Sequence, residues 1–283
     1  MKEFKDKVAV ITGAASGIGR AIADKCAEED MKVVLADINK KGLAIAEAEL
    51  KESGATVLSV PTDVSKAKDI EALSQKTLEA FGEVNLLVNN AAVYTTGTLW
   101  ENTISDWEWV LGVNLWGVIN GVRTFVPIMI EQDTEAHIVN VSSMAGLTRI
   151  TNIGPYTVSK HGIVALSETL FYELAERNPK VKVSVLCPGR VDTPVAYAAR
   201  KRFEATRGVP GEREMSPEDE AQIERMAGAF STGMDPREVA EKVFDAIRED
   251  KFYILTHPDQ EYLDRVKRRM DDILEERNPT LPA

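Results

Sequence analysis

Residues 12–19 read Thr12-Gly13-Ala14-Ala15-Ser16-Gly17-Ile18-Gly19, and they join the apolar run Val8–Thr12 to a helix-length segment, Ile18–Asp30. Glycines at such a junction let the backbone turn sharply and approach a pyrophosphate closely, where a Cβ would stand in the way. The N-terminus of the following helix offers free N–H groups and positive potential to the same anion. The stretch therefore predicts a dinucleotide-binding loop, and its expected contact residues are Gly13, Ser16, Gly17, Ile18 and Gly19.

An acidic residue, Asp37, stands 18 residues after the last of these glycines, directly behind a second apolar run, Lys32–Ala36. A carboxylate at this place can accept both hydroxyls of an adenosine ribose, and it repels a 2′-phosphate. The next residue is Ile38 rather than an arginine, although Lys40 and Lys41 follow closely. The sequence favours NAD over NADP as the cofactor, while a strand-end cap is the alternative role for Asp37.

Short and nearly continuous apolar runs recur through the first 190 residues and alternate with helix-length segments. Runs of this kind are typical of strands that are buried on both faces of a parallel sheet. Six strand–helix alternations predict one α/β domain, a doubly wound Rossmann-type parallel sheet of about seven strands flanked by helices. The predicted strands are Val8–Thr12, Lys32–Ala36, Val57–Pro61, Leu86–Asn89, His137–Ser142, Lys182–Leu186 and Lys251–Thr256. The predicted helices are Ile18–Asp30, Lys41–Ser53, Ile70–Phe81, Trp107–Glu131, Tyr156–Arg177 and Pro236–Asp250.

The 283 residues include 34 Lys+Arg and 45 Asp+Glu, for a net charge of −11. A nucleic-acid partner is not expected, because there is no basic surplus to displace counterions. The charged N-terminus argues against a secretory signal. The longest charge-free apolar stretch, Trp109 to Val122, has 14 residues, too few to cross about 30 Å of hydrocarbon. We expect a soluble, cytoplasmic protein without membrane contact.

The cysteines and histidines show no spacing typical of a metal site. Cys26 and Cys187 are 161 residues apart, and they are predicted to be buried free thiols. The three histidines, His137, His161 and His257, are scattered along the chain. No metal is therefore assigned.

Charge density rises sharply towards the C-terminus: 44 of residues 1–199 are charged, about 22%, against 35 of residues 200–283, about 42%. We expect residues 1–256 to form the dinucleotide-binding and catalytic domain. Within it, 196–234 are interpreted as an insert that covers the substrate, with short helical stretches only and with charges that face solvent. Residues 257–283 are expected to form a C-terminal helical extension, in which Tyr262, Val266, Met270 and Ile273 share one face.

Tyr156 and Lys160 are four residues apart, so on a helix they lie on one face, one turn from each other. A free tyrosine has a pKa of about 10 and is a poor base at neutral pH. A neighbouring ammonium and the positive ring of an oxidised nicotinamide would both favour the phenolate. The pair is then suited to move a proton to or from a substrate oxygen. An ordinary surface pair is the alternative, and the nucleotide loop upstream argues against it.

The order of the motifs resembles that of the short-chain dehydrogenase/reductase family, in its compact single-domain branch. The motifs are T-G-x-x-x-G-x-G, Asn89-Asn90-Ala91-Ala92, Ser143, Tyr156-x-x-x-Lys160 and Pro188-Gly189. The resemblance is dense over residues 5–195 and looser over Pro236–Thr256. The chain departs from the family pattern at Ala92, where the family carries glycine, and a methyl group near the cofactor is expected to alter packing more than chemistry.

The resemblance implies a catalytic tetrad and further cofactor contacts. In the family the serine hydrogen-bonds the substrate oxygen; Ser143 fits by its spacing, and the adjacent Ser142 competes for the role. The family's asparagine, here Asn114, bends a helix so that its carbonyl holds a water between the lysine and solvent. The implied tetrad is Asn114, Ser143, Tyr156 and Lys160. Besides the loop and Asp37, which is expected at the ribose hydroxyls, the resemblance implies further cofactor contacts: Asp63 and Val64 beside the adenine, Asn90 near the adenosine ribose, Val191 and Thr193 at the nicotinamide carboxamide, and Tyr156 and Lys160.

The expected function is an NAD(H)-dependent oxidoreductase that interconverts a secondary alcohol and a ketone. Apolar residues in the expected pocket favour a hydrophobic or aromatic carbinol over a sugar; they are Met144, Leu147, Ile150 and Val195. A non-catalytic NAD-binding regulatory protein is the alternative, and the complete tetrad argues against it. The helices Trp107–Glu131 and Tyr156–Arg177 match those that family members pack between subunits, which implies a homotetramer or homodimer.

Overall fold

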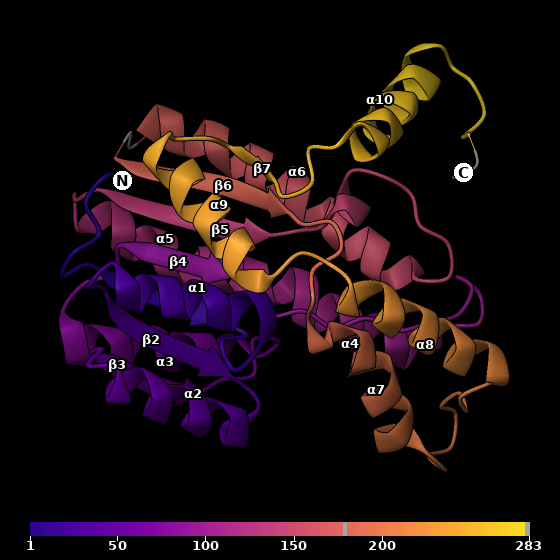
Figure 1. The fold of residues 1–283 in the computed structure, drawn as a ribbon, viewed down its shortest axis with the longest axis horizontal. Helices are drawn as coiled ribbons and strands as arrows, with labels where there is room; N and C mark the ends of the chain where they lie inside the picture. The colour runs from indigo at the N-terminus through magenta and orange to yellow at the C-terminus, as the bar shows by residue number, and fades with distance from the viewer. Residues whose placement is uncertain (178–179, 281–283) are drawn as a thin grey trace.

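The computed structural model describes residues 1–177 and 180–280, and in this part of the chain seven strands form one sheet (Figure 1). The strands are β1 (Val8–Thr12), β2 (Lys32–Asp37), β3 (Val57–Pro61), β4 (Leu86–Asn89), β5 (Ala136–Val141), β6 (Val181–Cys187) and β7 (Tyr253–Leu255). Their order is β3-β2-β1-β4-β5-β6-β7, and every neighbouring pair is parallel. The predicted doubly wound sheet is confirmed. Its order reverses between β1 and β4, where open α/β sheets bind their ligands.

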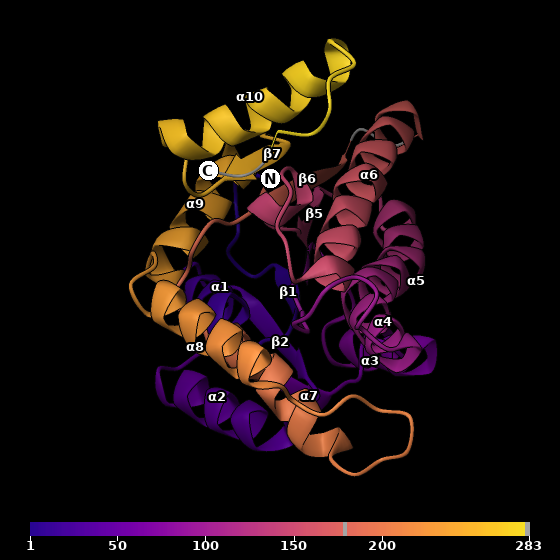
Figure 2. The same cartoon turned by 90° about the vertical axis from the view of Figure 1, so that its right-hand side faces the viewer.

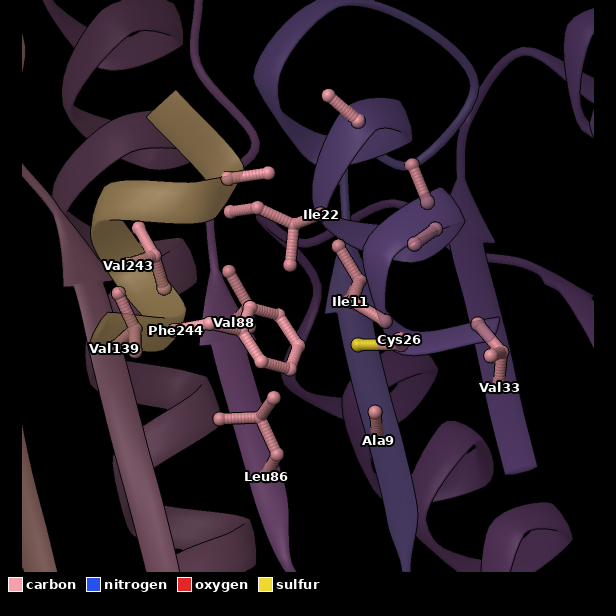
Figure 3. Packing of buried hydrophobic residues seen from close by; sticks show 14 of the residues in the cluster. Ala9, Ile11, Ile22, Cys26, Val33, Leu86, Val88, Val139, Val243 and Phe244 are labelled. Carbon is pink, nitrogen blue, oxygen red and sulfur yellow. The ribbon is translucent and has the colours of Figure 1, made fainter. Parts of the chain in front are cut away.

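Helices cover both faces of the sheet, because successive strand residues point to opposite sides. The helices are α1 (Gly17–Glu28), α2 (Lys40–Glu52), α3 (Ala67–Phe81), α4 (Ile104–Leu111), α5 (Gly117–Glu131), α6 (Gly154–Arg177), α7 (Ala198–Thr206), α8 (Pro217–Ser231), α9 (Pro236–Arg248) and α10 (Gln260–Leu274). Ala9 and Ile11 of β1 pack with α1, α2 and α9, whereas Val8 and Val10 pack with α3, α5 and α6. Figure 3 shows Phe244 of α9 lying over β1 and β4 in the first of these cores.

The predicted single helix Trp107–Glu131 is interrupted and begins earlier than expected. Thr103 caps α4 through a reciprocal pair of hydrogen bonds with Asp106, which sets the start at Ile104. A π-helical turn, Gly112–Trp116, separates α4 from α5. By length and composition alone the run Ile104–Glu131 could cross a membrane. In the fold, however, its α5 part packs against α3 and the sheet, as the core helix of a soluble protein does.

The segment between β6 and α9 is more regular than the sequence suggested. The expectation of short helical stretches only was wrong, since α8 has 15 residues. Ser216 and Asp219 cap this helix reciprocally, and Pro217 occupies its first turn. The two ends of the insert are joined by backbone hydrogen bonds, from Met234 N to Arg190 O at 2.9 Å and from Asp192 N to Met234 O at 3.0 Å. The insert therefore leaves the sheet and returns to it at the same place. Figure 2 shows α7 and α8 side by side at one end of the molecule.

Helix α10 lies apart from the insert and carries the expected face of Tyr262, Val266, Met270 and Ile273 (Figure 1). Tyr262 and Val266 pack against the core behind β6. Asp272 of α10 is buried and accepts a hydrogen bond from Arg149 at 3.0 Å. Of the expected extension 257–283, residues 281–283 lie outside the described range.

The buried His137 of β5 predicts acid sensitivity. Ser184 donates to Lys251 O at 2.6 Å, so His137 Nε2, 2.7 Å from Ser184 Oγ, acts as the donor to that hydroxyl. The other ring nitrogen, Nδ1, is buried without a partner among the described residues, and burial lowers the pKa of His137 to about 3. The unfolded chain, with a histidine pKa of about 6.5, binds a proton that the folded protein does not.

We therefore expect the free energy of unfolding to fall by up to about 1.4 kcal/mol per pH unit as the pH drops from about 6.5 towards 3. His137→Asn cannot titrate and should show a smaller decline than the wild type in urea unfolding series at pH 7, 6 and 5. Equal slopes for the two proteins would contradict the assignment.

Candidate active site

The glycine loop between β1 and α1 packs tightly against two other segments of the candidate site. A Cβ on Gly19 would lie 2.3 Å from Gly13 O and 2.5 Å from Asn90 Nδ2. Gly17 has a φ of +56°, and a Cβ there would lie 3.0 Å from Thr193 Cγ2. A larger residue at Gly19 would displace backbone, and one at Gly17 would be strained by the positive φ. The close approach brings the loop together with Asn90 and Thr193, both of which the sequence assigned to the cofactor.

Asn90 supports the loop from the end of β4. Its side-chain Nδ2 donates to Thr12 O at 2.9 Å and to Gly13 O at 3.3 Å. Its backbone N–H donates to Thr12 Oγ1 at 2.9 Å. The side-chain amide of Asn90 is therefore engaged in holding the loop, while its Oδ1 remains a potential acceptor.

Asp37 is the last residue of β2, and its carboxylate lies against the glycine loop. Oδ2 accepts the N–H of Ala15 at 3.0 Å, and Oδ1 accepts the N–H of Asn39 at 2.8 Å. Each carboxylate oxygen can accept a second hydrogen bond. The group is thus fixed in place with acceptor capacity to spare, as a ribose diol requires.

Asp63 and Val64 follow β3 and are also held by local contacts. Burial raises the pKa of Asp63, but hydrogen bonds from Ser65 and Lys66 outweigh it, so that the pKa lies below its usual range. The Val64 carbonyl accepts a hydrogen bond from Asn120 at 3.0 Å. These bonds fix the backbone of Asp63 and Val64 after β3, where the adenine is expected.

Tyr156 and Lys160 lie one turn apart in α6, with Lys160 Nζ 5.4 Å from the centroid of the Tyr156 ring. Lys160 is fully buried and donates to Val141 O at 2.9 Å. Burial lowers the pKa of Lys160 to about 7. Burial also raises the pKa of Tyr156, and a hydrogen bond with Ser143 opposes this rise only in part. The lowered tyrosine pKa expected from a neighbouring ammonium is not found in the protein alone, because desolvation of the buried hydroxyl outweighs the effect of Ser143.

The two adjacent serines after β5 have different surroundings. Ser142 Oγ is buried and donates to Lys160 O at 2.8 Å, so its proton is committed to the backbone of α6. Ser143 Oγ accepts the N–H of Ala145 at 3.1 Å, and its hydroxyl acts to lower the pKa of Tyr156. The geometry favours Ser143 as the group beside a reacting oxygen.

Asn114 sits in the π-helical turn and is fully buried. Its Oδ1 accepts Val93 N–H at 2.8 Å, and its Nδ2 donates to Val93 O at 2.9 Å and to Ser159 Oγ at 3.0 Å. Both polar atoms of the Asn114 side chain are therefore hydrogen-bonded within the protein. Only its backbone carbonyl, in the distorted turn, is left to hold the water that the family resemblance implies.

A model of the short chain dehydrogenase family matches residues 7–203, which is more than half of the chain. The chain belongs to the short-chain dehydrogenase family.

Other members of the short-chain dehydrogenase family resemble it over nearly their whole length. A CLA biosynthesis dehydrogenase/reductase from Lactiplantibacillus plantarum is 36% identical over 275 residues, which cover 96% of each chain. A 1-deoxy-11-beta-hydroxypentalenate dehydrogenase from Streptomyces exfoliatus is 32% identical over 95% of this chain and 89% of its own. The crystal structure of a Burkholderia phymatum short-chain dehydrogenase/reductase in complex with NAD is 46% identical, covers 100% of this chain and 99% of its own, and has a TM-score of 0.95.

In this short-chain dehydrogenase an apolar cluster lies beside the tyrosine of α6. The Tyr94 ring stands edge-on to the Tyr156 ring, with centroids 6.3 Å apart. Tyr94 OH donates to Ala196 O at 2.8 Å, at the start of the insert. Both tyrosines pack with residues of the insert and of the segment before α6: Ile153, Val195, Ala198, Ala199, Phe203, Met215 and Ile223. Of the four apolar residues that the sequence placed in the pocket, only Val195 belongs to this cluster. Met144 and Leu147 pack in a different core cluster, and Ile150 is exposed.

The expectation that the charges of the insert face solvent was wrong for several of them. The side chain of Asp219 is only 3% exposed and pairs with Arg213 at 2.6 Å, while Arg202 reaches Asp106 of α4 at 3.5 Å. The capping sequence Ser216-Pro217-Glu218-Asp219 was the available signal for α8, but no local pattern indicates its partners.

Neither the histidines nor the cysteines form a metal site in the described part of the chain, where no group of three or more His, Cys, Asp or Glu could hold an ion. Cys26 and Cys187 are buried and free, as predicted. Burial raises the pKa of the Cys187 thiol to about 12, so it is not a nucleophile at neutral pH.

Proposed function

We propose that this enzyme interconverts a secondary alcohol and a ketone with NAD(H). The observation that carries the proposal is the convergence of Ser143, Tyr156 and Lys160 at the carboxyl ends of parallel strands, next to a tightly packed glycine loop at the start of α1. The free N–H groups at the start of α1 and the acceptor capacity of Asp37 fit a dinucleotide. When bound, NAD would supply the hydride acceptor or donor.

Each residue has a defined task in this scheme. Tyr156 takes the hydroxyl proton when the alcohol is oxidised and returns it when the ketone is reduced. Ser143 lies beside Tyr156 and would donate its single hydroxyl proton to the substrate oxygen, which fixes the position of that oxygen. Lys160 has a pKa of about 7 and can carry a positive charge beside the tyrosine, which would favour the phenolate. Asn114 holds the π-helical turn against Val93 and Ser159.

The cofactor is proposed to be NAD rather than NADP. Asp37 is held by Ala15 and Asn39 at the edge of the glycine loop, where its negative charge would lie beside the 2′ position. A 2′-phosphate would meet that charge directly, and the carboxylate would lose the 2′-hydroxyl as a hydrogen-bond donor. The likeness to a structure that was solved with NAD supports this choice.

The substrate is proposed to be a hydrophobic or aromatic carbinol. The side chains that pack with Tyr156 include Tyr94, Ile153, Val195 and Phe203, so its surroundings are apolar and hold few donors for the hydroxyls of a sugar. One relative is named for a hydroxypentalenate substrate, and a carbinol on a hydrocarbon skeleton fits the same kind of wall.

The test is a screen of secondary alcohols, from aryl to steroid-sized, in which NADH absorbance is followed with purified protein. Turnover of bulky apolar carbinols above that of sugar alcohols is the expected result. A protein that binds NAD tightly and turns over none of the panel would instead support a regulatory role.

We also propose a cytoplasmic homodimer or homotetramer that is assembled through α5 and α6. A shallow groove runs between these helices, and its lining is mainly apolar: Val122, Ala165, Leu166 and Leu170, with Thr169 and Glu173. Light scattering of the purified protein gives its mass directly, and a monomer at micromolar concentration would refute this assembly.

A further inference from the structure

A buried ionic cluster joins the insert to the loop that follows β4. We name Thr96, Arg213 and Asp219 the latch. Thr96 Oγ1 donates to Asp219 Oδ1, Arg213 Nη1 donates to Asp219 Oδ2, and Arg213 Nη2 donates to Thr96 O, each at 2.6 Å. Thr96 lies 123 residues from Asp219 in the sequence, so the latch connects distant parts of the chain.

The latch is more than a surface ion pair, because its groups are removed from water. The Asp219 side chain is 3% exposed and that of Arg213 is 19% exposed. Arg213 Nε is buried without a hydrogen-bond partner among the described residues, and the guanidinium lies 5.0 Å from the centroid of the Phe203 ring. Taking such charges out of water is costly unless each is paired, so separating the two partners is strongly unfavourable.

A second arginine ties the other helix of the insert to α4. Arg202 donates to Ser105 Oγ and Glu212, approaches Asp106 at 3.5 Å, and lies over the Trp109 ring at 5.5 Å. With the backbone bonds at Arg190 and Met234, the insert is held at its base and along its length. Opening the latch would therefore release the outer part of the insert without detaching it from the sheet.

The loop that the latch holds also carries Tyr94, two residues before Thr96. Tyr94 is the residue that touches both the insert, through Ala196 O, and the Tyr156 ring. A shift of the insert is thus transmitted to the apolar wall next to Tyr156, which contains Phe203 from α7 and Ile223 from α8.

We propose that the latch fixes the apolar wall of the substrate pocket before substrate binds, and that Thr96, Arg213 and Asp219 are positioning residues that set the preference for bulky apolar carbinols. This inference rests on the proposed function for its substrate class, although the mechanical role of the latch does not depend on turnover. The latch does not contact the Tyr156 hydroxyl that transfers the proton. It holds the apolar wall against which the body of the substrate is proposed to lie. Its loss should therefore affect large substrates and spare small ones.

The test compares Arg213→Met with Arg200→Met. Arg200 also lies in the insert and pairs with Glu224 at 2.6 Å, but that pair is exposed and joins α7 only to α8. Two probes are used, 1-phenylethanol as a bulky carbinol and 2-propanol as a small one. Arg213→Met should raise KM for 1-phenylethanol about tenfold and leave KM for 2-propanol and Kd for NAD within about twofold. Arg200→Met should change none of the three.

Hydrogen exchange provides the readout that does not need turnover. Amides of 198–206 and 217–231 should exchange faster in Arg213→Met than in the wild type, while those of the sheet stay protected. If neither alcohol is oxidised but this exchange pattern appears, the mechanical role of the latch is supported and the proposed substrate class is refuted. Unchanged exchange in the insert would overturn the latch, and so would equal losses for both alcohols and NAD, which indicate a general structural role.

Two further variants keep the test decisive if Arg213→Met does not fold. Thr96→Val removes a single hydroxyl and should give the same pattern in weaker form. The double variant Arg213→Met/Asp219→Asn leaves no unpaired charge and should recover stability relative to Arg213→Met without recovering KM for 1-phenylethanol. Wild-type KM in both variants would overturn the proposal.

Discussion

Replacing Tyr156 with phenylalanine should lower alcohol turnover by about 10²–10⁴-fold and leave the affinity for NAD within about twofold. The ring, which packs against Tyr94, is retained, and only the hydroxyl that exchanges the proton is removed. The matched control is Tyr172→Phe, on the same helix, because the Tyr172 side chain is exposed and far from Ser143. Initial rates and a fluorescence titration with NADH measure the two quantities. Full turnover by Tyr156→Phe would refute the proposed mechanism.

The same assignment predicts a direction for the pH dependence. Burial raises the pKa of Tyr156 above its usual value of about 10, so the phenolate needed for alcohol oxidation is scarce at neutral pH. The rate of oxidation should therefore rise with pH above 7, whereas ketone reduction, which uses the protonated tyrosine, should not. Tyr156→Phe should lose this rise along with its activity.

The second large effect is expected from Asp37→Ala. Removing the carboxylate takes away charge-assisted hydrogen bonds to the ribose, each worth about 1.5–3 kcal/mol, so KM for NAD should rise by about 10–100-fold. Discrimination against NADP should fall at the same time, because the repulsion of a 2′-phosphate is lost. Steady-state kinetics with both cofactors measure the change.

Asp24→Ala is the control for Asp37→Ala, since Asp24 pairs with Arg20 at 2.8 Å on α1 and does not contact the glycine loop. Its cofactor kinetics should match those of the wild type. A wild-type enzyme that already prefers NADPH would contradict the role given to Asp37.

Local patterns were sufficient to predict most of the fold. Each central strand is a short, buried, β-branched run, and its bounds could be read to within about one residue. The edge strand β7 is shorter than predicted, because only Tyr253–Leu255 find partners on β6. The long helix α8 was not predicted. Ser216 and Asp219 form a capping pattern at its start, but the pattern lies in a charge-rich segment where only short helical stretches were expected.

The candidate site was predictable where its residues are close in sequence or lie at strand ends. Tyr156 and Lys160 share a helix face, and Asp37 follows a strand. The latch was not predictable, because Thr96 and Asp219 meet only in the folded chain. The raised pKa of Tyr156 was missed for the same reason: desolvation depends on the side chains that tertiary structure places around the ring.

The order of the strands leaves β3 and β7 as the open edges of the sheet. Long, flat edges with unpaired N–H and C=O groups invite strands from other molecules and promote aggregation. Here β3 ends in Pro61, which has no N–H to offer, and β7 is only three residues long. The sheet is thereby a poor template for growth by strand addition.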